Sequence, residues 1–197
     1  KTVVIQQDEL VPQSIAAVQK SVIRIVREGE SETLARGVMV SANGLAVTDR
    51  AALEAADNRN LEAILYSGER VPLEVRDDNA TTATVFVDVD VGTSTGFVPA
   101  TLADASKLTL GRTGVRIGGT GSDTVGEGVI AALAAAENEQ RTVVEASVAS
   151  ATPGAVLLTI FGEVIGIATP HLSPTNNTYT IIVLPNPASV TNQSSSS

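Results

Sequence analysis

Cysteine and tryptophan are absent from this chain of 197 residues, and aromatic residues make up only 3% of it. The lack of cysteine excludes disulfides, thiolate nucleophiles, iron–sulfur clusters and cysteine-based zinc sites. With so few aromatic rings, the core must be built from Val, Ile, Leu and Ala. The chain also has a single histidine, His171, so chemistry that requires an imidazole has one candidate.

Basic residues are the scarcer charged class, at 13 against 22 acidic residues, which gives a net charge of -9. Such a charge repels phosphate backbones, and we therefore expect no nucleic-acid partner. Long apolar runs are missing as well. The longest uncharged apolar run, residues 129–136, is well short of the roughly 20 residues that span a bilayer. We expect no membrane-crossing segment.

Apolar spacing predicts one short helix followed by a series of strands. Apolar residues recur near helical spacing from Leu10 to Val22, and Pro12 is placed to begin a helix over residues 12–20. Alternating or β-branched segments follow at short intervals, and Asn43-Gly44 is a strong hairpin signal. The predicted strands of this half are residues 21–27, 34–41, 45–49, 60–66, 71–76 and 83–89.

A segment rich in Gly, Ser and Thr, residues 92–111, is expected to link this half to a second one. Strands are predicted there at residues 113–118, 126–134, 142–148, 155–161, 163–169 and 178–184, although the alanine-rich stretch that begins at residue 129 could instead form a helix. Because closure removes exposed strand edges, we expect an all-β fold of two six-stranded antiparallel β-barrels with a short N-terminal helix. The expected boundaries are an N-terminal extension and helix at 1–20, barrels at 21–91 and 112–187, and a disordered polar tail at 188–197.

The order of these segments resembles the trypsin-like (chymotrypsin) fold of HtrA/Do-like serine proteases. Three motifs carry the likeness: the Asn-Gly hairpin that leads to Val-Thr-Asp at residues 47–49, SKLTLG at 106–111 and GEVIGI at 162–167. The resemblance extends over residues 12–187. It implies two β-barrels with a cleft between them. We also expect an extracytoplasmic location, periplasmic or at the cell surface, with a membrane tether before Lys1 left open.

The same resemblance assigns a catalytic triad to positions that hold other residues in this chain. Hydrolysis needs a serine oxygen, an imidazole that accepts its proton and a carboxylate that orients the imidazole. The histidine position falls on Ala51, the carboxylate position on Thr82 and, in an alignment without gaps, the serine position on Pro153. With a gap of about three residues, no serine is present there at all. Proline also lacks the backbone N–H that an oxyanion hole would use.

His171, Ser147 and Ser150 are the remaining candidates for a rearranged active site. The resemblance places His171 beside the substrate cleft, so it is either a relocated base or an exposed loop residue, and we favour the loop residue. Ser147 is near the end of a predicted strand and Ser150 in a turn, and neither has an identifiable partner base. An active endopeptidase is therefore the least favoured hypothesis.

No cofactor and no metal site are predicted. Asp77, Asp78, Asp88 and Asp90 could bind calcium, but they lack the spacing of a calcium loop and suit a solvated acidic rim. The stretch GGTGSD at residues 118–123 lacks the Gly-Lys-Ser/Thr ending of a phosphate loop, and we expect a turn between strands.

The leading hypothesis is an HtrA-like pseudoprotease that is not an enzyme and that binds a protein or extended peptide, or acts as a scaffold. In the resembled family an extended peptide pairs with a strand edge at the cleft. The corresponding residues are Gly154, Ala155, Ala168, Thr169 and His171. The first alternative is a structural subunit of a homo-oligomer or extracellular assembly, formed through the N-terminal region. The second is an active serine endopeptidase with a rearranged site.

Overall fold

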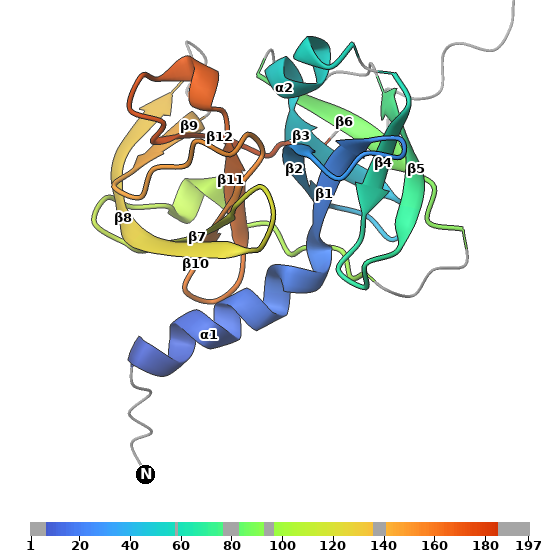
Figure 1. Cartoon of the computed structure of the whole chain (residues 1–197). Coiled ribbons are helices and arrows are strands. Elements are labelled where there is room, and N and C mark those ends of the chain that lie inside the picture. Colours follow the sequence, from blue (N-terminus) through green and yellow to red (C-terminus); the bar gives the residue numbers. More distant parts are fainter. Residues whose placement is uncertain (1–6, 58, 77–82, 93–96, 136–140, 185–197) are drawn as a thin grey trace, which may run out of the picture.

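A computed structural model describes residues 7–57, 59–76, 83–92, 97–135 and 141–184. Two closed antiparallel barrels lie side by side, as Figure 1 shows, with neighbouring strands in the orders β1-β2-β3-β6-β5-β4 and β10-β11-β12-β9-β8-β7. The first barrel contains β1 (Val22–Arg27), β2 (Thr33–Met39), β3 (Leu45–Asp49), β4 (Leu61–Ile64), β5 (Arg70–Arg76) and β6 (Thr84–Val89). The second contains β7 (Thr113–Gly118), β8 (Thr124–Ala135), β9 (Arg141–Ala146), β10 (Val156–Thr159), β11 (Val164–Ala168) and β12 (Thr178–Ile181). The expected fold class is confirmed.

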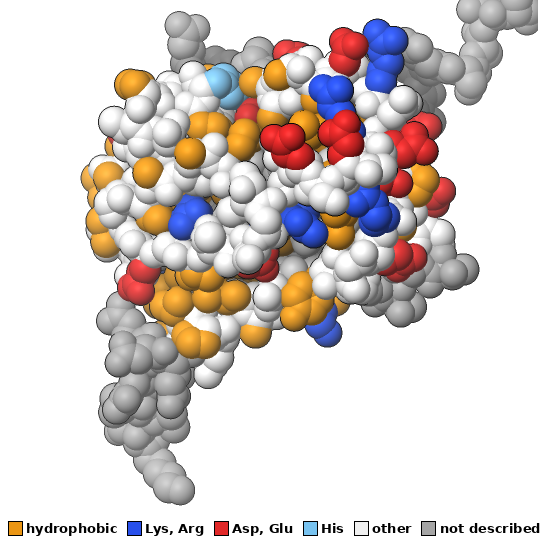
Figure 2. All heavy atoms as spheres, viewed as in Figure 1, with side chains coloured by type: hydrophobic (Ala, Val, Ile, Leu, Met, Phe, Trp, Pro, Cys, Tyr) orange, Lys and Arg blue, Asp and Glu red, His pale blue; other side chains and the backbone are white. Residues whose placement is uncertain are grey.

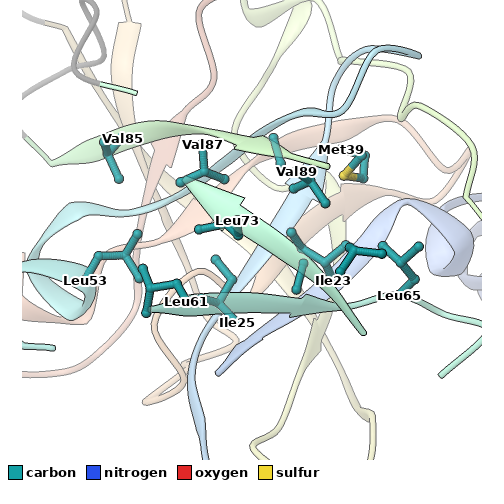
Figure 3. Packing of buried hydrophobic residues seen from close by; sticks show 13 residues of the cluster. Ile23, Ile25, Met39, Leu53, Leu61, Leu65, Leu73, Val85, Val87 and Val89 are labelled. Atoms are coloured by element: carbon teal, nitrogen blue, oxygen red, sulfur yellow. The ribbon is translucent and has the colours of Figure 1, made fainter. Parts of the chain in front are cut away.

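Aliphatic residues fill most of the barrels, as the shortage of aromatic rings predicted, and Phe86 and Tyr179 are buried among them. Side chains of alternate strand positions point inward, because successive residues of a strand face opposite sides of the sheet. Figure 3 shows this packing in the first barrel, where Val85, Val87 and Val89 of β6 face Ile23 and Ile25 of β1. A second buried cluster spans the boundary between the barrels and includes residues of both.

The Asn-Gly signal marks the turn between β2 and β3 and fixes the register of the hairpin. Gly44 has a φ of +94°, which L side chains rarely adopt, and a Cβ there would lie 2.1 Å from the Val89 carbonyl oxygen. The backbone N–H of Val89 donates to the Gly44 carbonyl at 2.9 Å. Glycine is therefore needed both for the turn and for the close approach of β6.

The helical elements differ from the sequence prediction. Helix α1 covers Gln7–Val18, so Pro12 lies inside it and does not begin it. A proline costs one helical hydrogen bond, and here the Ser14 hydroxyl donates to the Val11 carbonyl at 2.8 Å. A second helix, α2 (Arg50–Ala55), follows β3 without having been predicted. The alanine-rich stretch forms strand β8 as far as Ala135 and not a helix; no described helix is long and apolar enough to cross a membrane.

The loop between β7 and β8 of the second barrel contacts strand β2 of the first barrel. It is the GGTGSD stretch, and its Gly119 carbonyl accepts a hydrogen bond from Nε of Arg36 on β2 at 2.7 Å. Nη1 of the same guanidinium is 2.7 Å from Oδ1 of Asp123, while the Arg36 side chain is almost fully buried. The Thr33 hydroxyl donates to the Thr120 carbonyl. We call these contacts of Arg36 and Thr33 with the loop the clasp. In the clasp, the buried cation of the first barrel is neutralised by a carboxylate of the second.

Candidate functional site

The turn before β10, which contains Pro153 and Gly154 and is called the boundary turn below, packs directly on strand β2 of the first barrel. The Arg36 N–H donates to the Pro153 carbonyl at 2.8 Å, and the Gly154 N–H donates to the Ala168 carbonyl at 2.8 Å. Gly154 has a φ of +71°, and a Cβ on it would be 1.7 Å from the Arg36 carbonyl oxygen. The position that the resemblance assigns to the nucleophile is thus held by backbone bonds to both barrels.

The end of strand β3 meets this turn from the other side. Thr48 is buried, and its hydroxyl donates to the Arg36 carbonyl at 2.6 Å. Asp49 ends the strand, and Ala51 follows in the first turn of α2, where it is half-buried. The fold therefore brings the elements of Ala51 and Pro153 to the same boundary. Thr82 lies outside the described residues.

His171 contacts Asp49 across that boundary. It sits in the 3-10 turn η3 (Pro170–Leu172), which follows β11, and its Nδ1 is 3.4 Å from Oδ1 of Asp49. The Asp49 side chain is 2% exposed and the His171 side chain 37%. In Figure 1, α2 and the orange turn of η3 lie at the same end of the two barrels, and Figure 2 shows the pale-blue histidine at the surface. His171 is thus a partly exposed residue at the boundary between the barrels, in contact with a buried carboxylate.

Burial determines the electrostatics of Asp49. Desolvation raises the pKa of this carboxyl to about 6, against the pull of His171, which is the largest influence that lowers it. The amide groups of Ala51 and Ala52 also lower the pKa, although the side chain makes no capping hydrogen bond to α2. Oδ1 has no hydrogen-bond partner among the described residues. A carboxylate so placed is costly to ionise, and the imidazole offsets part of that cost.

No described contact brings His171 to a hydroxyl group. The Ser150 hydroxyl is buried and donates to the Thr152 carbonyl at 3.3 Å. The Ser147 hydroxyl accepts from the Val129 N–H on β8 at 2.8 Å. Proton transfer from a nucleophile to a base needs a heavy-atom distance of about 3 Å. Within the described part of the chain, the pairing that an active protease requires is not formed.

The five residues predicted to contact a peptide lie together, and four of them are buried within the fold. Ala155, Ala168 and Thr169 are fully buried, and the Thr169 hydroxyl is hydrogen-bonded to that of Thr180 at 3.0 Å. Gly154 is buried as well. His171 alone of the five presents an exposed side chain. Contact of the other four with a peptide remains a prediction.

Backbone groups at the expected peptide edge are also in use. The Thr169 N–H donates to the Thr178 carbonyl at 3.1 Å. The Leu172 N–H donates to the Thr169 carbonyl at 3.0 Å, and the Ser173 N–H to the Pro170 carbonyl at 3.3 Å. Pro170 has no N–H to offer. A peptide that paired with this edge would therefore have to displace η3.

The acidic residues weighed as calcium ligands are engaged or undescribed. Asp88 is 3.5 Å from Nη1 of Arg76, and Asp90 accepts from the Gly92 N–H at 3.2 Å. Asp77 and Asp78 lie outside the described residues. Among the described side chains, no three of His, Asp or Glu are grouped closely enough to hold a metal ion.

The roles of two residues of this region were not predicted from the sequence. Arg36 resembles any other charged residue on a strand, and nothing in the sequence indicates that it is buried. Asp49 was treated as part of the motif before Ala51, because its partner His171 comes from the other barrel. The sequence did hold one indication of this pair. The resemblance places both the Val-Thr-Asp motif that ends at Asp49 and the single imidazole, His171, at the cleft between the barrels.

Comparisons with known proteins identify the fold. No family model matches the chain, and no curated protein matches it. Among solved structures, the crystal structure of Deg5 is 18% identical, covers 90% of this chain and 90% of its own, and superposes with a TM-score of 0.71. Two structures of the HtrA-type protease AlgW with a decapeptide are each 16% identical with a TM-score of 0.69 and cover 90% of this chain.

This chain spans only 63% and 64% of the two AlgW chains. At these identities the likeness concerns the architecture alone. The two closed six-stranded barrels of this chain match the double-barrel architecture. The chain therefore has the trypsin-like double-barrel fold of HtrA-type proteases.

Proposed function

We propose that this chain is a non-hydrolytic binding domain, which uses a protease fold to hold a protein or extended peptide without cutting it. The observation that carries the proposal is the boundary itself. Pro153 occupies the turn where the resemblance expects a nucleophile, and the only imidazole of the chain faces a carboxylate of the opposite barrel. Among the described residues no hydroxyl lies next to this imidazole, and acyl transfer needs such a pair to begin.

Three further features support the proposal. Ala51 has a methyl group where the resembled proteases have an imidazole, and a methyl group cannot accept a proton. Pro153 offers no N–H for an oxyanion hole. Its carbonyl is bonded to Arg36, which fixes the turn in place. In the resemblance all three triad positions hold other residues, Ala51, Thr82 and Pro153, which is more than an inactivation by one substitution would require.

Incubation with unfolded casein tests the proposal. We expect the purified chain to release no peptides over a day at neutral pH, and to retain labelled casein peptides in a pull-down. His171→Ala is the matched control, because a protease that relied on this imidazole would lose its activity in the variant. Casein turnover that co-purifies with the chain and disappears in His171→Ala would overturn the proposal.

An exposed apolar surface favours a second candidate function, a structural subunit of an assembly. Phe161 and Leu110 of the second barrel are 64% and 62% exposed, and Val129 is 42% exposed. Phe161 lines a cavity of about 270 Å³ together with Leu108, Ile130 and Ile165. Figure 2 shows apolar side chains gathered at the lower left of the molecule. Exposed apolar clusters of this kind are typical of protein interfaces.

Light scattering separates the two candidates. A monomer that binds peptides supports the binding domain, whereas a defined particle of many copies supports the structural subunit. Phe161→Ser should leave a monomer unchanged and dissolve a particle that is held together by this surface. Assembly through the N-terminal region predicts instead that removal of residues 1–18 dissociates the particle into monomers.

A further inference from the structure

Two arginines lie directly opposite each other on the outer face of the first barrel. Arg24 of β1 is the register partner of Arg36 of β2. The neighbours of Arg24 in the chain, Ile23 and Ile25, are in the core of the barrel, so Arg24 points outward. Side chains paired in this way are about 5 Å apart at Cβ, and like charges at this spacing repel each other. The fold thus holds two cations together on a chain whose net charge is -9.

A cavity of about 270 Å³, called the arginine cavity below, lies next to this pair. It is bounded by Arg24 and Arg36, by the turn between β4 and β5 and by the β7–β8 loop. Tyr66 of that turn lines the cavity and is 50% exposed, so the cavity reaches the surface. Cavities that hold whole small molecules commonly begin at about 300 Å³. The arginine cavity is therefore of a size that suits a single side-chain group.

The charged residues that line the arginine cavity are two cations and one anion. They are Arg24, Arg36 and Asp123. Asp123 is committed to the clasp, where its Oδ1 is 2.7 Å from Nη1 of Arg36. Arg24 instead donates from Nη1 to the Gly121 carbonyl at 3.3 Å. One positive charge of the cavity is therefore left without a carboxylate of its own.

The Arg36 guanidinium is also only partly satisfied by its neighbours. Its Nε and Nη1 are engaged in the clasp, but Nη2 has no hydrogen-bond partner among the described residues. A buried donor without a partner is costly, and a negative charge nearby offsets that cost. Only 2% of the Arg36 side chain is exposed, so it acts through its charge. Arg24 is half-buried and is the residue that a ligand can touch.

We propose that the arginine cavity binds a carboxylate group, supplied by an acidic side chain of a bound peptide or protein. The Arg24 guanidinium donates to the carboxylate, whose two oxygens match the planar fork of this group. Val22 and Ile64, which also line the cavity, contact the methylene groups of the acidic side chain. The peptide as the source of the carboxylate rests on the proposed binding function, whereas the carboxylate site itself does not.

A single carboxylate fits this cavity better than a more highly charged group. The Asp123 side chain is 37% exposed at the cavity, and its charge repels a phosphate dianion more than a carboxylate. The net charge of -9 likewise repels a run of acidic residues. The ligand is therefore an isolated acidic residue in a segment of low charge.

An NMR titration of the intact chain at pH 7 tests the site. The two probes are N-acetylglutamic acid α-amide, which carries one carboxylate, and N-acetylglutamine α-amide, which carries none. The Nε–H signals of Arg24 and Arg36 and the amide signal of Gly121 report on the cavity. We expect saturable shifts of these signals with the glutamate compound alone. Equal shifts with both compounds, or no saturable shift with either, would overturn the site.

Two variants should change the affinity for the glutamate compound in opposite directions. Arg24→Gln removes the donor and should weaken binding about tenfold, the loss expected for one charged hydrogen bond. Asp123→Asn keeps an oxygen that can accept from Arg36 but removes the competing charge, so it should strengthen binding. The control Arg27→Gln removes a charge from the same strand outside the cavity and should leave the affinity nearly unchanged. An unchanged affinity in Arg24→Gln, or weaker binding by Asp123→Asn, would contradict the assignment.

Inorganic phosphate and labelled peptides distinguish the possible sources of the anion. Phosphate that shifts the same signals at lower concentration than the glutamate compound would overturn the carboxylate in favour of a phosphate group. The peptides are fluorescein-labelled fragments of dephosphorylated casein, bound to the parent chain and to Arg24→Gln. Binding that is about tenfold weaker in Arg24→Gln supports both the site and the binding function.

The two proposals can also fail separately in these experiments. Binding of the glutamate compound without binding of any peptide leaves the carboxylate site standing and overturns the binding function. Equal peptide binding by the parent chain and by Arg24→Gln leaves the binding function standing and overturns the part of the arginine cavity in peptide recognition.

Discussion

At the scale of single residues, Asp49 is the group whose protonation most affects the folded state. Burial raises its pKa to about 6 from the ordinary 3.8, so the folded chain holds a proton that the unfolded chain loses at lower pH. The stability that Asp49 contributes is therefore fully present below about pH 4 and is lost as the pH rises through 6. This direction is opposite to that of a carboxylate in a strong ion pair.

The substitution Asp49→Asn tests this sign. The amide cannot ionise, so the free energy of unfolding of the variant relative to the parent should rise between pH 4 and 7 by on the order of 2 kcal/mol. Urea denaturation at four pH values measures the difference. Glu54→Gln is the control, and its difference should stay flat. A difference for Asp49→Asn that falls with pH would show that the carboxylate is stabilised in the fold.

At the scale of elements, the boundary turn before β10 is the most tightly constrained backbone. Gly154→Ala would place a Cβ 1.7 Å from the Arg36 carbonyl, and backbone on both sides prevents relief. We expect a loss of more than about 3 kcal/mol in the free energy of unfolding, measured by urea denaturation. The control is Gly111→Ala, which has a similar φ of +78° with nothing within 4 Å of the added Cβ.

The control separates backbone strain from collision. Gly111→Ala should cost only about 1 kcal/mol, because the left-handed conformation is its sole penalty. Equal losses for the two variants would mean that the turn does not pack on β2 as described.

Strands were predictable from the sequence because their evidence is local. Alternation, β-branching and the Asn43-Gly44 signal lie within a few residues of the elements that they mark, and the predicted strands overlap those observed. Helix α2 was missed because six residues of Ala, Leu, Arg and Glu after a strand have too short a pattern to show helical spacing. Pro12 was misplaced because tertiary packing of α1 outweighs the lost hydrogen bond.

The site was less predictable, since its contacts join the two barrels. Ala51 and Pro153 could be placed only by resemblance, and their shared boundary required the fold. The pair of Asp49 and His171 is invisible to periodicity, because each residue is unremarkable in its own segment. Burial of Arg36 likewise depends on a loop of the other barrel.

At the scale of the whole molecule, the clasp between β2 and the β7–β8 loop links the two barrels, and we expect them to unfold together. Arg36→Met would remove the guanidinium that donates to the Gly119 carbonyl and contacts Oδ1 of Asp123. We expect the free energy of unfolding to fall by about 2 kcal/mol, because the Gly119 carbonyl loses this donor, whereas the Asp123 carboxylate is 37% exposed and can be solvated. Urea denaturation followed by two spectroscopic probes measures it.

A pair within one barrel provides the comparison. Arg70 and Glu62 are bonded side chain to side chain, and both are partly exposed. Arg70→Met should therefore cost clearly less stability than Arg36→Met. If this variant lost as much stability as Arg36→Met, the clasp would have no special part in holding the barrels together.

The most direct test of the proposal that the chain does not hydrolyse peptides is labelling with a fluorophosphonate probe. The probe reacts with an activated serine, and measurement of the intact mass detects the adduct. On the proposal that the chain is not a hydrolase, with Pro153 in the boundary turn and His171 facing Asp49, we predict an unchanged mass after prolonged incubation at pH 7.5. An adduct that maps to one serine and disappears in His171→Ala would contradict this and show an active, rearranged protease.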